Sequence, residues 1–323
     1  MASYHLSATI IGRSDGRSAV AAAAYRSGST LVDAETGQVH DYTRKGGVVA
    51  AFIVAPDGAP EWATDRATLW SAVHAKEARK NSQLARELTL ALPNELPVAE
   101  AEALVRAWVA DECVSRGMIA DVAIHDPPPR PGKSRNRHAH AMLTMRQLDA
   151  ATADGWSKNK TRDWNAPETL EAWRASWAEA QNAALERAGA ADRVDHRSLT
   201  DQRAAAIEAG DDLLAEALNR PPEPRLGVAA GAVDRKAGHP VTDRGIALAN
   251  AREARGALLD ALDRARTAAR SIADAMRHAT RPVSGLTASL FSRPARSPAA
   301  APSRPEPPKV GDTTLDDDDP TPA

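Results

Sequence analysis

Three histidines lie in two short apolar runs of the sequence. The first run, residues 121–125, ends at His125, and the second, residues 138–143, carries His138 and His140. Side chains alternate between the two faces of a β-strand, so His138 and His140 share one face. If the two runs pair as antiparallel strands, the three imidazoles meet. Neutral imidazole is the commonest protein ligand for divalent transition metals, and three of them leave positions open for substrate, so the pattern predicts a metal site.

The segment between the two runs, residues 126–137, contains four prolines. Proline fixes φ and lacks a backbone donor, so this segment cannot continue a helix or a central strand. We expect it to form a hairpin-like connection that returns the chain beside His125. The spacing alone also allows a simpler interpretation, in which His125 ends a strand and the other two histidines form a polar strand face without a metal.

Two further side chains could take part in chemistry. Tyr25 lies near the end of a predicted helix of residues 19–26, and it is the best placed nucleophile among the three tyrosines of the chain. A packing role for Tyr25 is the alternative. Glu87 lies in a predicted strand whose leucines face the core, which places Glu87 and Thr89 on the opposite face. The alternative for Glu87 is a solvated strand residue.

The composition narrows the class of protein. With 323 residues and 43% hydrophobic content, the chain can form a substantial core and a second segment. Aromatic residues make up only 4%, so we expect an alanine-rich, helix-rich core with the seven tryptophans as large fillers. The single cysteine, Cys113, excludes an internal disulfide and fits a reducing cytoplasm, and its place in a predicted helix disfavours catalysis. No signal peptide or membrane insertion is expected.

Strands and helices alternate along the first half of the chain. Alternating and β-branched runs predict strands over residues 3–12, 46–55, 83–92, 118–124 and 139–146. The intervening segments predict helices over residues 19–26, 64–80 and 98–116, and a loop or short hairpin over residues 31–45. This order predicts an α+β domain with one mainly antiparallel five-stranded sheet and flanking helices over one face, which leaves the other face free to hold a site.

The second half of the chain predicts helices followed by a tail. Helical patterns cover residues 166–189, 201–209 and 242–280, and the last of these is rich in alanine and arginine. From residue 281 the sequence is rich in proline and serine and ends in a run of aspartates, which is typical of disorder. We therefore expect a domain over residues 1–230, a long helical extension over residues 231–280 and a disordered tail over residues 281–323.

The net charge of −2 gives no general sign of nucleic-acid binding, but local clusters do. Residues 126–162 contain eight Lys or Arg and three Asp, and the basic loop of residues 154–164 carries Trp156 and Trp164. Cations interleaved with aromatic rings suit a single nucleic-acid strand, although both tryptophans could instead pin the loop to the core. The residues predicted to grip phosphates are Arg13, Arg17, Arg26, Arg44, Lys45, Lys133, Arg135 and Arg137, and those predicted to contact bases are Trp156, Lys158, Lys160 and Arg162.

Several of these segments together resemble a known family, the MobA/MobL conjugative relaxases of the MOBQ group. The resemblance is carried, in order, by Tyr4-His-Leu6, Arg17-Ser-Ala19, Ala24-Tyr-Arg26, Asp41-Tyr-Thr-Arg-Lys45, Arg86-Glu87, Ala91-Leu-Pro93, Arg137-His-Ala-His-Ala-Met-Leu143 and Asp195-His-Arg-Ser-Leu199. It covers about residues 1–230, which makes it more specific than the histidine pattern alone. It implies an HUH endonuclease fold for this segment.

The resemblance also implies an activity. Tyr25 matches the family's nucleophile, and His125, His138 and His140 match its ligands for a divalent cation, Mg²⁺ or Mn²⁺. Glu87 matches an acidic residue beside the metal, although Thr89 stands where the family often has a second glutamate. The implied reaction nicks single-stranded origin-of-transfer DNA, leaves a 5′-phosphotyrosine and a free 3′-OH, and rejoins the strand after plasmid transfer.

The resemblance further implies a cytoplasmic relaxase that enters the recipient cell with the DNA. Its expected partners are accessory mobilisation proteins and the coupling protein of a type IV secretion system. Two alternatives stay open at this point. A zinc hydrolase would use the same three histidines with a bound water and no tyrosine. A noncatalytic DNA-binding mobilisation accessory protein would keep the basic clusters without a metal.

Overall fold

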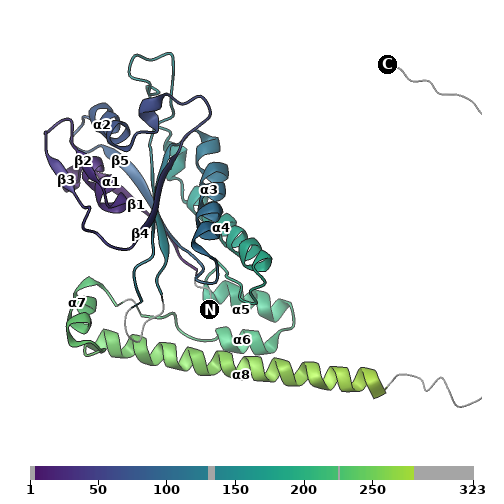
Figure 1. The fold of residues 1–323 in the computed structure, drawn as a ribbon. Helices are drawn as coiled ribbons and strands as arrows, with labels where there is room; N and C mark the ends of the chain where they lie inside the picture. The colour runs from purple at the N-terminus through teal and green to yellow at the C-terminus, as the bar shows by residue number, and fades with distance from the viewer. Residues whose placement is uncertain (1–3, 130–134, 225, 280–323) are drawn as a thin grey trace, which may run out of the picture. The chain divides into compact units, whose positions relative to one another are not determined.

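The central element of the fold is a five-stranded antiparallel sheet (Figure 1). This computed structural model describes residues 4–129, 135–224 and 226–279. In spatial order, the strands are β1 (Leu6–Gly12), β5 (Gln83–Ala91), β7 (His138–Leu143), β6 (Ala120–His125) and β4 (Val48–Val54). Each strand lies within a few residues of its predicted limits, which confirms the α+β class and the antiparallel sheet.

One face of the sheet is covered by two helices and a hairpin (Figure 1). These elements are α1 (Ala19–Ser27), α2 (Arg66–Lys76) and the hairpin strands β2 (Thr30–Val32) and β3 (Val39–Asp41). The apolar side chains of α1 and α2 pack against Met142 of β7 and Ile11 of β1, and Trp70 of α2 and Trp156 are the largest members of this core. The segment predicted as a loop or short hairpin therefore contains the hairpin.

The other face of the sheet packs against α3 (Val98–Glu112) and α4 (Pro167–Arg187). Trp108 of α3 and Trp177 of α4 meet edge to face, 5.2 Å between ring centroids, above Leu88 of β5. The prediction that helices cover only one face is therefore wrong. Both faces carry apolar side chains along the strands, and each of these surfaces needs a helical layer to exclude water.

Helix α1 is short, and both of its ends are fixed. The Ser18 hydroxyl accepts a hydrogen bond from the Ala21 N–H, 3.2 Å, which satisfies one of the free donors of the first turn. Gly28 follows the helix at φ 64°, a left-handed conformation, and its N–H donates to the Ala24 carbonyl. A side chain at Gly28 would also lie only 3.2 Å from Val48 of β4. The position of the last turn, which carries Tyr25, is set by these contacts.

Helices dominate the rest of the described chain. They are α5 (Leu199–Glu208), α6 (Asp212–Leu218), α7 (Val228–Ala237) and α8 (Asp243–Ala279). Single 3₁₀ turns occur at η1 (Arg13–Asp15), η2 (Glu61–Ala63), η3 (Val114–Arg116) and η4 (Arg162–Asn165). The sequence predicted α5 and α8 but not the short helices α6 and α7.

The chain divides into two compact units, residues 1–263 and residues 264–323. The expected disordered tail, residues 281–323, lies outside the described residues, and the predicted domain limits stay predictions. Among the helices described, none combines the length and the apolar character that crossing a bilayer requires.

Candidate metal centre and nucleophile

The pairing of β6 with β7 brings the three histidines together. His125 lies directly opposite His138, and His140 follows two residues further along β7 on the same face. The ring centroids are 5.2 Å apart for His125 and His138, 4.8 Å for His125 and His140, and 5.0 Å for His138 and His140. One ring nitrogen from each histidine lies within 4.8 Å of those of the other two. The predicted convergence of the three imidazoles is confirmed.

Hydrogen bonds to the backbone and to Glu87 orient each imidazole. Nδ1 of His138 donates to the Asn136 carbonyl, 2.8 Å, and Nδ1 of His140 donates to Glu87 Oε1, 2.7 Å, which leaves both Nε2 atoms available. Nε2 of His125 donates to the Arg26 carbonyl, 2.7 Å, which leaves its Nδ1 available. A hydrogen bond on the far nitrogen fixes the tautomer of a metal ligand, so this donor set fits a divalent ion.

Burial favours the neutral form of two of these imidazoles, those of His125 and His138. Burial lowers the pKa of His125 to about 4, and the positive charge of Lys45 adds to this effect. Burial likewise lowers the pKa of His138. A neutral imidazole has a lone pair to offer a metal, so protons compete little for His125 near neutral pH.

Glu87 orients His140 and does not fit the role of a base. Only 7% of its surface is exposed, which excludes the solvated alternative. Arg26 Nε donates to Glu87 Oε1, 2.5 Å, and Arg26 Nη2 forms a second, very short contact with Oε2. Burial raises the pKa of Glu87, but the hydrogen bonds from His140 and Arg26 outweigh burial and lower it to about 2. A carboxylate held in this way is a poor proton acceptor, so Glu87 is placed to orient His140 and not to take a proton.

Thr89 occupies the position where the family often has a second acid. It pairs with His140 across β5 and β7, and its hydroxyl lies 3.5 Å from His140 Nδ1. The hydroxyl is a weaker partner than the Glu87 carboxylate, which lies 2.7 Å from the same nitrogen. One acid therefore orients His140.

Tyr25 lies beside the histidines and is open to solvent. Its side chain is 49% exposed, which does not fit the alternative of a packing anchor. Tyr42 contacts the ring edge to face, 5.3 Å between centroids, and Lys45 Nζ lies 3.7 Å from the ring centroid. The same Nζ is 3.5 Å from His125 Nε2, so Lys45 lies between Tyr25 and the histidine cluster. Burial and the charge of Arg26 lower the pKa of Lys45 to about 8.

The structure assigns Arg137 and Arg135 to internal ion pairs. Arg137 is 4% exposed, donates to Asp126 at 3.0 Å and donates to the Leu96 carbonyl at 2.5 Å. Its predicted phosphate contact is wrong because the guanidinium is buried. Arg135 is more exposed and forms two 2.5 Å hydrogen bonds with Asp126, so both arginines brace the start of β7.

Two other predicted DNA contacts also serve the fold. Arg13 donates to the carbonyl oxygens of Glu77, 3.1 Å, and His74, 2.6 Å. Lys160 Nζ pairs with Glu77, 2.9 Å, and donates to the Gln83 carbonyl, 2.7 Å. These cations stabilise the junction of α2 with β5. Their charges are directed at acceptors within the protein.

The tryptophans of the basic loop are core residues. Trp156 is 2% exposed and packs against Trp62, 5.2 Å between ring centroids, and Trp164 is 5% exposed. The predicted base contact of Trp156 is wrong, since a buried ring offers no face for stacking. The predicted cations that remain exposed are Arg17, Arg44, Arg135, Lys158 and Arg162, of which Arg135 is paired with Asp126. The predicted contact at Lys133 lies outside the described residues.

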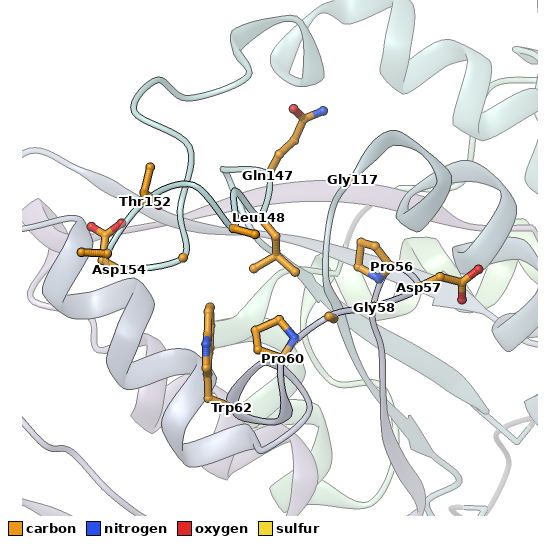
Figure 2. A pocket seen from close by; sticks show the side chains of 14 residues that line it. Pro56, Asp57, Gly58, Pro60, Trp62, Gly117, Gln147, Leu148, Thr152 and Asp154 are labelled. Atoms are coloured by element: carbon orange, nitrogen blue, oxygen red, sulfur yellow. The ribbon is translucent and has the colours of Figure 1, made fainter.

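Figure 2 shows a surface pocket of 650 Å³ whose lining includes none of the three histidines. Residues 56–62, which follow β4, and residues 147–155, which follow β7, form most of its lining. The histidines lie at the opposite end of these strands, because His125 pairs with Val48 at the start of β4. The pocket is therefore separate from the candidate metal centre.

Relatives of the chain carry names from plasmid mobilisation and conjugation. Mobilization protein MobL of Acidithiobacillus ferridurans is 35% identical over 266 residues, which cover 74% of this chain and 65% of MobL. Conjugal transfer protein TraA of Agrobacterium fabrum is 34% identical over 267 residues, which cover 73% of this chain and 22% of TraA. The chain thus spans less than two thirds of either relative.

A solved structure and a family profile agree with these relatives. The structure, described as "Molecular Basis of Vancomycin Resistance Transfer in Staphylococcus aureus", is 34% identical with a TM-score of 0.56, and the match covers 61% of this chain and all of that one. The profile of the MobA/MobL family matches residues 17–212, a segment that includes Tyr25, Glu87 and all three histidines. The chain belongs to the MobA/MobL family.

Proposed function

We propose that this chain is a plasmid mobilisation relaxase that nicks one strand of origin-of-transfer DNA through Tyr25. The observation that carries the proposal is the meeting of an exposed tyrosine with three histidines, each oriented by a hydrogen bond, at one end of the sheet. Membership of the MobA/MobL family and the names of the MobL and TraA relatives support the substrate class.

In the proposed reaction, the Tyr25 hydroxyl oxygen attacks the scissile phosphorus in line with the 3′ oxygen. The new bond joins the tyrosine oxygen to phosphorus as the bond to the 3′ oxygen breaks. The phenol loses its proton and the departing 3′ oxygen gains one, so the products are a 5′-phosphotyrosine and a free 3′-OH. The phosphotyrosine keeps a reactive phosphodiester, and attack by a 3′-OH reverses the step and rejoins the strand.

His125, His138 and His140 would hold the divalent ion, for which we propose Mg²⁺ or Mn²⁺. When bound, the ion offsets negative charge on the nonbridging phosphate oxygens. Glu87 keeps His140 in the orientation that presents Nε2. We further propose a cytoplasmic protein that travels with the DNA into the recipient, together with accessory mobilisation proteins and a type IV coupling protein as partners.

The test is covalent capture of DNA. The full chain is incubated with a single-stranded oligonucleotide from the origin of transfer of its own plasmid and Mn²⁺ or Mg²⁺, and the mixture is run on a denaturing gel. We expect a slower protein band that carries the oligonucleotide, that EDTA prevents and that Tyr25→Phe abolishes while DNA binding persists. Tyr42→Phe is the matched control and should still form the band.

The alternatives give different results in the same experiment. A zinc hydrolase that acts on a small substrate would form no covalent band with DNA. A noncatalytic accessory protein would also form no band, and it would bind DNA equally well after His138→Ala. A band of normal intensity with Tyr25→Phe would contradict the assigned nucleophile.

A further inference from the structure

We propose that Arg26 and Lys45 are positioning residues that fix Tyr25 against the three histidines, and that neither is primarily a phosphate contact. This inference rests on the proposed function, because it concerns how the same site is assembled. From the sequence, both residues are predicted to contact DNA phosphates. Their contacts in the structure point inward, toward the metal ligands and the end of α1.

Arg26 connects α1 to two of the three metal ligands. Its carbonyl accepts the hydrogen bond from His125 Nε2, 2.7 Å. Its guanidinium forms a two-point contact with Glu87, which in turn accepts from His140 Nδ1 at 2.7 Å. Because Arg26 directly follows Tyr25, any shift of the tyrosine along the helix disturbs the orientation of two imidazoles.

The guanidinium of Arg26 has little charge left for DNA. Its side chain is 18% exposed, and its Nη1 also donates to the Ala22 carbonyl of the preceding turn, 2.9 Å. Three of its five N–H groups already donate, to Glu87 and to the Ala22 carbonyl, and a two-point contact with phosphate would compete with the pair to Glu87, whose side chain is 9% exposed. Leaving a buried carboxylate without its partner is unfavourable, so the arginine is held in place.

Lys45 makes the corresponding link on the other side of Tyr25. Its Nζ donates to the Tyr25 carbonyl, 2.8 Å, and lies 3.7 Å from the centre of the Tyr25 ring. A cation over the face of a ring is attracted to it, and Tyr42 closes the edge, 5.3 Å between centroids. Lys45 and Tyr42 therefore hold the ring, while almost half of Tyr25 stays exposed for a substrate.

The two roles predict different effects on binding and on rate. A lost phosphate contact lowers the salt dependence of single-strand binding, by about 0.7 in the slope of log K against log salt. A lost positioning contact leaves this slope unchanged and slows the step at saturating DNA. Residues that orient metal ligands also affect metal affinity, typically by about 10- to 100-fold.

The experiment uses the full chain with Arg26→Gln, Arg26→Lys, Lys45→Met and Lys45→Arg. It measures the rate of covalent band formation at saturating oligonucleotide, the salt slope of binding and, by calorimetry without DNA, the affinity for Mn²⁺. Arg44→Gln, at an exposed predicted phosphate contact, is the comparison for the salt slope. Arg106→Gln is the neutral control, because Arg106 stacks on Phe52 on the opposite face of the sheet.

We expect Arg26→Gln to lower both the rate and the Mn²⁺ affinity by about 10- to 100-fold, with an unchanged salt slope. Arg26→Lys should restore little, since an ammonium cannot form the two-point contact. Lys45→Met should slow the rate at least about tenfold, and Lys45→Arg should recover most of it because a cation remains over the ring.

Reduced salt slopes with normal rates at saturation would overturn the inference and return both residues to DNA binding. Circular dichroism and thermal melting identify variants that fail to fold. If Arg26→Gln fails to fold, Lys45→Met still tests the inference, because Lys45 is only partly buried. If the unmodified chain forms no covalent band, the proposed function fails, whereas the effect of Arg26→Gln on Mn²⁺ affinity still decides the positioning role of Arg26.

Discussion

The two faces of the central sheet are built from the same strands and have different tasks. On the face toward α3 and α4, β5, β6 and β7 present leucine, valine, isoleucine and alanine, and the tryptophans of the two helices seal this layer. On the face toward α1 and α2, the alternate residues include Glu87, Asp121 and the three histidines. Alternation along the strand therefore places a folding core and a chemical site only one residue apart in sequence.

The polar face also contains a purely structural group, which shows that a buried acid need not be catalytic. Asp121 is 5% exposed and accepts hydrogen bonds from Trp70 Nε1, 2.8 Å, and from Arg66 Nε, 2.9 Å. Both partners lie on α2, so Asp121 ties that helix to β6. The site lies at the His125 end of the strand, where three imidazoles converge and each uses one ring nitrogen for a hydrogen bond to the protein.

The largest effect should come from removing one ligand. His138→Ala leaves two imidazoles, so we expect loss of measurable Mn²⁺ binding and of the covalent DNA band, with the fold intact because His138 is only partly buried. Calorimetry measures the loss of Mn²⁺ binding, and the denaturing gel measures the loss of the covalent DNA band. EDTA added to the unmodified chain should also abolish the band. Normal Mn²⁺ affinity in the variant would place the metal elsewhere.

A change on the opposite face should act on stability alone. Trp177→Ala removes a fully buried ring that packs on Trp108 and should lower the free energy of unfolding by about 3–5 kcal/mol. Urea denaturation with EDTA measures this change. The folded fraction should keep its Mn²⁺ affinity, and a large loss of that affinity would mean that the two faces are not independent.

A smaller effect should follow from loosening His140 without removing it. Glu87→Gln keeps the shape of the side chain but removes its negative charge. The carboxylate normally pairs with Arg26 and accepts a hydrogen bond from His140. We expect Mn²⁺ affinity to fall by about 10- to 100-fold, with DNA binding retained. Thr89→Val, which removes only the more distant hydroxyl, is the matched comparison and should have a weaker effect. Equal effects would argue against Glu87 as the main orienting group.

The smallest effect concerns pH and the metal-free chain. Burial and the charge of Arg13 lower the pKa of His74 on α2, although Asp33 and Glu35 oppose the shift. As the pH falls, His74 takes up a proton in the unfolded chain, near the ordinary histidine pKa of about 6.5, before it does so in the folded chain. The free energy of unfolding is therefore highest above that pH and decreases below it.

Urea denaturation of the EDTA-treated chain between about pH 7.5 and 5.5 measures this loss around the ordinary histidine pKa. His74→Gln should reduce the slope of stability against pH, and His125 and His138 should account for part of what remains. The core against α3 and α4 contains no histidine among the described residues, so Trp177→Ala should leave the slope unchanged. An unaltered slope in His74→Gln would assign the titration elsewhere.

Strand pairing and the histidine cluster could be predicted because both follow from local rules. A period of two residues fixes the face of His138 and His140, and the prolines after Asp126 force the chain to return. The short helix before Gly28 follows equally from its caps. These features need no knowledge of which distant segments meet.

The rest of the site depends on packing between segments far apart in the sequence. Arg26 meets Glu87 across 61 residues, and nothing in the local pattern of either marks this contact. The same limit explains Arg137, whose partner Asp126 becomes a neighbour only after the hairpin closes. Basic residues look alike in sequence whether they contact phosphates or internal acids. Burial, which separates the two cases, arises only from the tertiary fold.

The most direct test of the central claim is to identify the residue that carries DNA. The three tyrosines fall into three different tryptic peptides, residues 1–13 for Tyr4, residues 18–26 for Tyr25 and residues 27–44 for Tyr42. Digestion of the covalent complex with trypsin and nuclease, followed by mass spectrometry, should find the nucleotide phosphate only on peptide 18–26. Nucleotide on either of the other peptides, or no modified peptide from a metal-loaded reaction, would contradict the account.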